Sequence, residues 1–195
     1  EEELDENIQD KSQYYMDVIG SSSKRISYLV NDILAYTTAS NAEMVITDLD
    51  LSESVSSAID EVRNLIDEKS AKITVGKLPT AKGDETAVKL LLQNLISNSV
   101  KYHKDGVTPK ISIRSKSLAK NDVIEIVDNG IGFSEENAGK IFEVFQRLHQ
   151  KNEYSGTGIG LAICKKVVKN HGGTIWLEST EGVGTTFHFT IPFTA

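Results

Sequence analysis

The sequence has little cysteine and no long apolar run. Its single cysteine, Cys164, excludes an internal disulfide framework and fits a reducing compartment. No run of about 18 apolar residues occurs, so we expect no transmembrane helix and no membrane contact within this segment. The acidic start, EEELDEN, has none of the positive charge of a secretory signal peptide. We therefore expect a cytoplasmic location, which leaves open membrane association of a longer parent protein.

Positive charge is also in deficit. The 21 Lys and Arg residues against 28 Asp and Glu give a formal net charge of −7. This balance argues against a general nucleic-acid binder, which normally carries a basic field. It does not argue against a nucleotide ligand, because a local site can be positive in an acidic protein. Hydrophobic residues make up 39% of the chain, which is ordinary for a soluble globular protein.

Residues 4–40 predict one long helix, with no proline and only Gly20 as an internal glycine. At 1.5 Å per residue this helix would be roughly 55 Å long, too long for a small globular core. Its residues at alternating steps of four and three form a heptad seam, which packs along partner helices. The seam consists of Tyr15, Ile19, Ser22, Ile26, Leu29, Ile33 and Tyr36. Because one helix cannot satisfy such a seam alone, it predicts a partner helix.

The pattern breaks over residues 37–51, which predicts a boundary between segments 1–45 and 46–195. The boundary region includes one extended stretch at 45–47. The sequence after it predicts helices at about 53–69 (capped by Ser52), 84–103, 135–141 and 158–170. It also predicts strands at 72–76, 110–117, 122–128, 174–179 and 185–191. This order indicates an α+β fold: a two-layer sandwich with a mixed sheet and helices on one face, preceded by a coiled-coil-type helix.

A polar stripe occurs in LLQNLISNSVKYH. Asn94, Asn98 and Lys101 share one face of the predicted helix, beside a face of leucines and isoleucine that enters the core. A solvated surface stripe explains this pattern about as well as a site does. As a site, the amide oxygens suit Mg²⁺, which takes one or two protein oxygens besides phosphates and water, and the lysine suits phosphate.

Two glycine-rich stretches follow. In IEIVDNGIG, Asp128 ends a strand before Gly130 and Gly132; this suits a hydrogen-bond acceptor for a base or sugar, although an ordinary turn is the simpler explanation. In SGTGIGLAICKKVVKNHGG, three alternate glycines precede a helix, which predicts either a phosphate cradle or a hinge. The spacing matches neither a Walker loop nor a dinucleotide-binding fingerprint.

Each motif is ambiguous, but their order is specific. Asn-x-x-x-Asn-x-x-Lys, Asp-x-Gly-x-Gly, Phe-x-x-Phe, Gly-x-Gly-x-Gly and the Gly-x-Gly-Thr of EGVGTTF follow one another. This series resembles the ATP-binding domain of sensor histidine kinases, in the gyrase, chaperone and MutL-like superfamily with the Bergerat fold. The resemblance covers residues 46–193, and the residue sequence there is most similar to the phytochrome-like and hybrid branches of the family.

The resemblance implies roles around ATP and Mg²⁺. Asn98 would be the metal ligand, and Asn94 would stand where the superfamily's ATPases usually carry a water-activating glutamate. Lys101 and Tyr102 would reach the phosphates, and Asp128 would accept from the adenine amino group. The remaining implied nucleotide-binding residues are Gly130, Gly132, Phe142, Phe145, Gly156, Thr157, Gly158, Gly160, Leu161 and Thr186. Phe142 and Phe145 would anchor a lid formed by residues 146–157, in which Arg147 could touch phosphate or solvent.

The long helix resembles the second helix of the family's dimerisation and phosphoacceptor hairpin. The first helix, with its acceptor histidine, is absent, because none of the four histidines lies within residues 1–45. The implied partners are ATP, a response-regulator receiver domain and a second copy through a completed hairpin, with no nucleic acid. The alternatives are a nucleotide-dependent conformational ATPase of the same superfamily and a silent interaction module.

Overall fold

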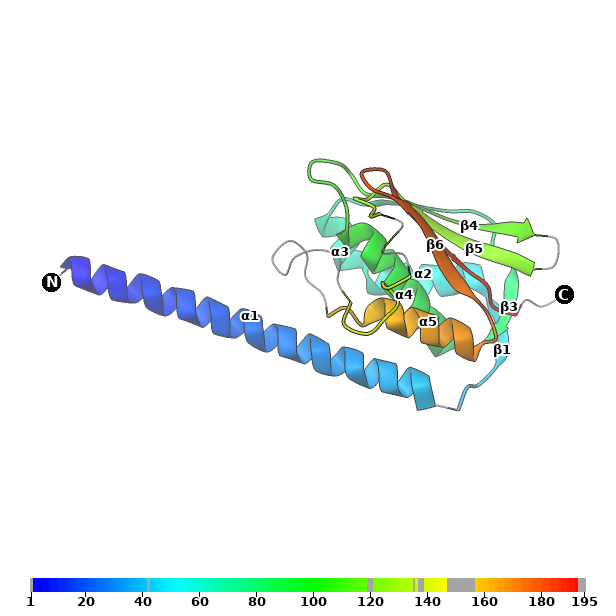
Figure 1. Ribbon diagram of the computed structural model, residues 1–195, viewed down its shortest axis with the longest axis horizontal. Coiled ribbons are helices and arrows are strands. Elements are labelled where there is room, and N and C mark those ends of the chain that lie inside the picture. Colours follow the sequence, from blue (N-terminus) through cyan, green and yellow to red (C-terminus); the bar gives the residue numbers. More distant parts are fainter. Residues whose placement is uncertain are drawn as a thin grey trace.

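The computed structural model describes residues 2–41, 43–118, 121–134, 136, 139–146 and 157–192. It begins with one long helix, α1 (Glu2–Asn41), as predicted. Figure 1 shows α1 reaching well beyond the domain that follows, with its C-terminal half beside helix α5. None of the helices in these ranges is both long enough and apolar enough to cross a membrane.

The domain contains a mixed five-stranded sheet in the order β2–β4–β5–β7–β6 and a two-stranded ladder, β1–β3. Strand β2 runs parallel to β4, and the other neighbours are antiparallel. The elements are β1 (Thr47–Asp50), α2 (Leu51–Glu61), α3 (Arg63–Glu68), β2 (Lys72–Val75), β3 (Thr80–Gly83), α4 (Glu85–Lys101), β4 (Lys110–Leu118), β5 (Asn121–Asp128), α5 (Gly160–Asn170), β6 (Ile175–Thr180) and β7 (Gly184–Phe189). The predicted mixed sheet and two-layer α+β fold are confirmed.

The core lies between one face of the sheet and helices α2, α4 and α5 (Figure 1). Because side chains alternate along a strand, one row across three strands points to the helices. Ile113, Ile126 and Phe187 form that row and are buried. They pack in one cluster with the apolar face of α4, which consists of Leu91, Leu92, Leu95 and Ile96.

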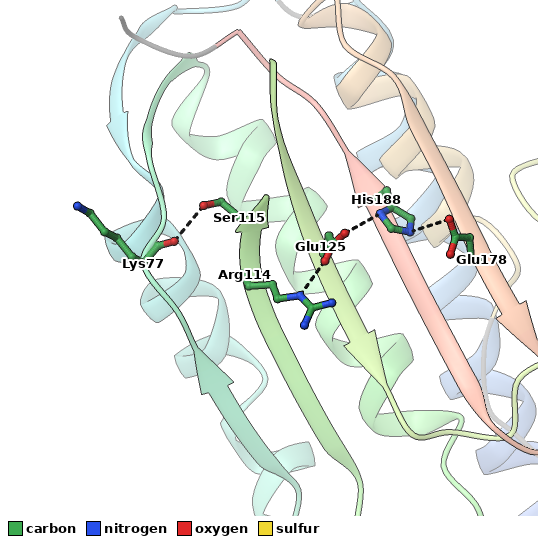
Figure 2. A network of polar contacts seen from close by, with 6 residues as sticks. All are labelled: Lys77, Arg114, Ser115, Glu125, Glu178 and His188. Atoms are coloured by element: carbon green, nitrogen blue, oxygen red, sulfur yellow. Dashed lines mark hydrogen bonds and ion pairs between the residues drawn. The ribbon is translucent and has the colours of Figure 1, made fainter. Parts of the chain in front are cut away.

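The opposite face of the sheet carries a polar row, shown in Figure 2. The Arg114 Nε donates to Glu125 Oε2 at 2.7 Å, and His188 Nδ1 lies 3.5 Å from Glu125 Oε1. The Trp176 ring stacks on the His188 ring at 5.1 Å between centroids. This row faces away from the helices, so it is separate from the predicted site.

Several predicted boundaries were wrong for local reasons. Asp50, not Ser52, caps α2, because its Oδ1 accepts from the Ser52 N–H at 2.7 Å. The predicted helix 53–69 is interrupted at Val62, which separates α2 from α3. The extended stretch lies at Thr47–Asp50 rather than 45–47, and β3 was not predicted. Of the short helix predicted at 135–141, residues 135, 137 and 138 lie outside the described residues, and 139–141 form a turn.

The heptad seam of α1 is divided between the domain and solvent. Leu29 and Tyr36 are partly buried and pack against the domain core. Four other members are between 44% and 64% exposed: Tyr15, Ile19, Ile26 and Ile33. The exposed part fits the prediction that another helix covers the seam.

His171 joins the ends of two helices beneath the sheet. Its Nε2 accepts from the Asp84 N–H at 2.9 Å, and its Nδ1 is 2.8 Å from the Val167 carbonyl oxygen. Asp84 is the N-cap of α4, with Oδ1 accepting from the Ala87 N–H at 2.9 Å. The buried imidazole therefore links the end of α5 to the start of α4, the helix that carries Asn94 and Asn98.

Replacing His171 by alanine should lower the free energy of unfolding by about 3 kcal/mol, because the partly buried Asp84 N–H would lose its acceptor and the buried imidazole would leave a cavity. Urea unfolding followed by circular dichroism measures this. Lys169→Ala, an exposed change in the same helix, is the matched control and should shift the midpoint little. Equal midpoints for both variants would contradict the structural role of His171.

Candidate functional site

The C-terminal half of α4 carries a polar edge beside its apolar face. Asn94, Asn98 and Lys101 are half-buried, whereas Leu91 and Leu95 are fully buried. The Asn94 Nδ2 donates to the Leu90 carbonyl at 2.8 Å, which turns Oδ1 away from its own helix. The predicted stripe is thus an edge between core and solvent, and not a freely solvated surface.

Asp128 ends β5 on the helix-covered face of the sheet. Its Oδ1 accepts from the Gly130 N–H at 2.9 Å and from the Thr185 N–H at 3.0 Å. Burial raises the pKa of the Asp128 carboxyl, and the hydrogen bonds from Gly130, Thr185 and the Ser99 side chain oppose this rise without cancelling it. Both backbone N–H groups donate to Oδ1, so Oδ2 takes neither of these two bonds.

The loop after Asp128 is clamped between two elements. The Ile131 N–H donates to the Tyr102 carbonyl at 2.9 Å, and the Ile131 carbonyl accepts from the Gly182 N–H at 2.7 Å. Gly132 has φ of +59°, and a Cβ there would lie 2.0 Å from the Thr180 carbonyl oxygen. Only glycine fits this position, so the glycine motif sets how closely the loop approaches the β6–β7 turn.

Asn129 holds the same loop from the other side. Its Oδ1 accepts from the Lys110 N–H at 2.7 Å, and its Nδ2 donates to the Thr108 carbonyl at 3.1 Å. Asp-Asn-Gly therefore does form a structural turn, which was the simpler of the two explanations of this motif. The same residues also hold Asp128 in place, so the two interpretations of this motif are compatible.

Thr185, and not Thr186, lies beside Asp128. Thr186 pairs with Val127 in β5 and Glu178 in β6, and alternation along β7 turns its side chain to the face that carries His188. The structure therefore does not bring Thr186 to the Asp128 carboxylate. Alternation along the sequence places Thr185 and Thr186 on opposite faces of the sheet, but only the register between β5 and β7 shows which of them lies on the face of Asp128.

Three hydroxyl groups lie on the elements that hold Asp128, and none was predicted. The Thr185 Oγ1 lies 3.0 Å from the Ser179 Oγ, which also accepts from the Phe133 N–H at 3.0 Å. The third hydroxyl, of Ser99, belongs to α4 and follows Asn98 directly. The Asp128 end of the site is therefore assembled from α4, β5, β6 and β7.

The glycine-rich stretch before α5 meets α4 and α1. A Cβ at Gly160 would lie 2.5 Å from the Asn94 Oδ1, so the start of α5 touches the polar edge of α4. Among the residues that the structure describes, no side chain caps the N-terminus of α5, and the first N–H groups of such a helix end can bind an anion. The Thr157 hydroxyl donates to the Asp32 carboxylate of α1, a contact that the sequence did not predict. Leu161 packs half-buried against the core, and Gly156 lies outside the described residues.

The two phenylalanines of the predicted lid anchor occupy different environments. Phe142 is buried in the core, whereas Phe145 is 60% exposed and has φ of +67°. The Phe145 N–H donates to the Gly158 carbonyl at 3.0 Å, which ties this segment to the glycine-rich stretch. Of the predicted lid, 147–156 (which include Arg147) lie outside the described residues.

The site therefore has two ends connected by α4. At one end, Asp128, Gly130 and Gly132 meet the last turn of α4 through Tyr102; at the other, Asn94 meets Gly160. Asn98 lies on α4 between these ends. The described ranges contain no group of three or more His, Cys, Asp or Glu that could hold a metal alone.

Comparisons with known proteins point to one family. A family model for histidine kinase-, DNA gyrase B- and HSP90-like ATPases matches residues 83–195. The phytochrome-like protein Cph1 of Synechocystis sp. is 39% identical over 191 residues, covering 98% of this chain and 25% of that protein. The adaptive-response sensory kinase SasA of Rippkaea orientalis is 34% identical, covering 84% of this chain and 43% of that protein. The chain spans less than half the length of these relatives.

Solved structures agree on the fold. Full-length ShkA in complex with AMPPNP superposes with a TM-score of 0.75 at 24% identity, covering 94% of this chain and 39% of that one. The nucleotide-free catalytic domain of the histidine kinase ThkA superposes with a TM-score of 0.64 at 29% identity, covering 78% of this chain and all of that one (100%). The architecture is therefore that of histidine kinase catalytic domains.

Gly132→Ala should weaken AMPPNP binding by about ten-fold or more, because the left-handed backbone and the Thr180 carbonyl both oppose a Cβ. Calorimetric titration measures the affinity. Gly76→Ala is the control, since its Cβ would meet its nearest neighbours at 3.6 Å, an ordinary contact. Unchanged affinity in Gly132→Ala would show that the clamped loop does not shape the site.

Proposed function

The chain belongs to the histidine kinase-, DNA gyrase B- and HSP90-like ATPase family, and on that premise we propose that it is the ATP-binding catalytic part of a two-component sensor histidine kinase. Residues 46–195 form the catalytic domain in this proposal, and residues 1–45 form the second helix of a dimerisation hairpin. The observation that carries it is the Asp128 carboxylate, of which one oxygen is held by two backbone N–H groups while the other takes neither of these bonds.

Asp128 binds the adenine end. Its Oδ2 accepts from the exocyclic amino group, and the orientation of the carboxylate is set before the base arrives. An amino group is a donor, whereas the oxo group of guanine is an acceptor and is repelled by a carboxylate. The buried position strengthens this discrimination, because water cannot substitute for the missing donor.

The other end suits a metal-bound triphosphate. The Asn98 side-chain oxygen provides one hard ligand, and the residues around it supply no further cluster of carboxylates or imidazoles in the described ranges. This sparse donor set fits Mg²⁺, which takes most of its ligands from phosphate oxygens and water. Bound there, Mg²⁺ would neutralise charge on the phosphates. The Thr157–Leu161 segment at the start of α5, which meets Asn94, would bind phosphate oxygens, and the side chains of Lys101 and Tyr102 would reach them from the last turn of α4, beside the Asp128 loop.

The chemistry is phosphoryl transfer to histidine. An imidazole nitrogen attacks the γ-phosphorus, the bond to the β-phosphate oxygen breaks, and ADP leaves; the protein positions the groups and stabilises charge. Asn94 is neutral and its Nδ2 is bonded to the Leu90 carbonyl, so it is not a base for activating water. This disfavours hydrolysis by a conformational ATPase, and the similarity to the sensory kinase SasA favours the kinase.

The partners follow from the same proposal. The acceptor histidine lies on a helix outside this chain, because residues 1–45 contain none. The exposed seam of α1 would pack in a homodimeric hairpin bundle, and a response-regulator receiver domain would take the phosphoryl group. A cytoplasmic location fits this proposal, because ATP and a receiver-domain partner would both be available there.

The kinase is tested by extending the chain with a helix that completes the hairpin and carries a histidine. Incubation with labelled ATP and Mg²⁺ should give acid-labile, base-stable phosphate. Asn98→Ala should lower the rate by about 100-fold or more through loss of the metal ligand, while the exposed change Asn64→Ala should leave it unchanged. ATP turnover without phosphoprotein would favour the conformational ATPase, and no ATP binding would favour a silent module.

ATP affinity should also fall at acid pH. The pKa of Asp128 is raised by burial, so the acceptor is protonated at a higher pH than an ordinary aspartate. Affinity is full above this raised pKa and is lost as pH falls through it. Because the folded chain then holds the proton more tightly than the unfolded chain, protonating Asp128 does not itself unfold the domain.

Titrations of ATP from neutral pH downward, with circular dichroism on the same samples, separate loss of binding from unfolding. Asp128→Asn is the control, since it keeps the shape of the side chain but cannot titrate. It should bind weakly with only the pH dependence of ATP itself. The same pH profile in both proteins would contradict the assignment of Asp128.

A further inference from the structure

The linker between α1 and β1 is held to the domain through its backbone. Residues 43–46 form neither helix nor strand, and the side chains of Val45 and Ile46 are 70% and 50% exposed. The Val45 N–H nevertheless donates to the Asp84 Oδ2 at 3.0 Å, although the two residues are 39 positions apart. Because these two apolar side chains bury little surface, the backbone bond holds the linker at this point more than side-chain packing does.

Asp84 serves three elements at once. Besides the linker, its Oδ1 accepts from the Ala87 N–H at 2.9 Å at the start of α4, and its own N–H donates to the His171 Nε2 at 2.9 Å at the end of α5. Burial acts to raise the pKa of the Asp84 carboxyl, but the N–H groups of Ala87 and Val45 and the His171 imidazole lower it overall. The carboxylate is therefore charged at neutral pH, and hydrogen bonds to a charged acceptor are the stronger ones.

The packing of α1 on the domain covers only part of this helix. The side chains of Leu29, Ala35 and Tyr36 pack against the core and are partly buried, while the N-terminal part of α1 extends well beyond the domain (Figure 1). At 1.5 Å per residue the 40 residues of α1 span about 60 Å, so a rotation of about 10° at the linker moves the far end by about 10 Å. The direction of α1 is therefore sensitive to the path of the linker.

We propose that Asp84 is a latch that sets the direction in which α1 leaves the domain. With the Asp84 Oδ2 on the Val45 N–H, the chain is fixed two residues before β1 begins at Thr47. Without that bond, Val45 and Ile46 can rotate about their own backbone dihedrals, up to the pairing of Thr47 with Gly83. The latch ties the direction of α1 to two core helices, because the same residue caps α4 and is bonded to the end of α5. It involves no nucleotide, so it does not depend on the proposed kinase activity.

Two substitutions break the latch from opposite sides. In Asp84→Asn the side-chain oxygen can still cap α4, because asparagine caps helices as well as aspartate does. Its amide nitrogen, however, is a donor and cannot accept from the Val45 N–H. Val45→Pro removes the same bond from the linker, because proline has no N–H. Val45→Ala is the matched control, since it changes the same exposed side chain and keeps the N–H.

The direction of α1 is measured as a distance between two spin labels in the full chain, without nucleotide. Ser22→Cys in α1 and Asn64→Cys in α3 provide exposed labelling positions, and the native Cys164 is fully buried and escapes the label. The labelled chain is diluted with excess unlabelled chain, so that only distances within one chain contribute. Pulsed electron paramagnetic resonance then gives the distance distribution of each variant.

The unsubstituted chain and Val45→Ala should give the same narrow distribution. Asp84→Asn and Val45→Pro should both broaden it, because the ratio of the original arrangement to all others falls about ten-fold when a hydrogen bond to a charged acceptor is lost. Circular dichroism shows whether each variant is folded, and if one is not, the other decides. The proposal is overturned if either folded latch variant keeps the narrow distribution, or if Val45→Ala broadens it equally.

Discussion

The shared Oδ1 of Asp128 is the contact on which the geometry of the site depends. By accepting from Gly130 and Thr185, this single oxygen fixes the loop after β5 against the start of β7. A carboxylate buried without such donors would be costly, so the two N–H groups make the buried charge tolerable. They do so without using Oδ2, and the loop they hold is the one that contacts the end of α4 through Tyr102.

Local patterns in the sequence predicted most of the fold. The unbroken heptad pattern predicted α1, and the leucines and isoleucine of LLQNLIS predicted the buried face of α4. Both predictions were possible because helical periodicity can be recognised from residues that are close together in the sequence. Alternation and turn residues predicted β4 to β7 in the same way. The polar edge at Asn94 and Asn98 was predictable because it lies on the same helix, one turn apart. These features need no knowledge of what lies opposite them in space.

The features that were missed depend on partners distant in the chain. The placement of Thr185 instead of Thr186 beside Asp128 follows from pairing between β5 and β7, and strand β3 exists because it pairs with β1. Asp50 rather than Ser52 caps α2 because its carboxylate accepts from the Ser52 N–H in the first turn of the helix. Ser99 is conspicuous only once burial is known. Composition and periodicity carry no record of such contacts.

With Thr157 among the proposed phosphate-binding residues, its bond to Asp32 would make the docking of α1 and the binding of phosphate interdependent. A hydroxyl has one proton to give, and a phosphate oxygen and a carboxylate would compete for it. Thermodynamic reciprocity then requires the two effects to be equal. The factor by which withdrawing Asp32 changes nucleotide affinity is the factor by which bound nucleotide changes the equilibrium between docked and withdrawn α1. A movement imposed at the N-terminal end of α1 would thus be transmitted through the helix to the glycine-rich stretch before α5.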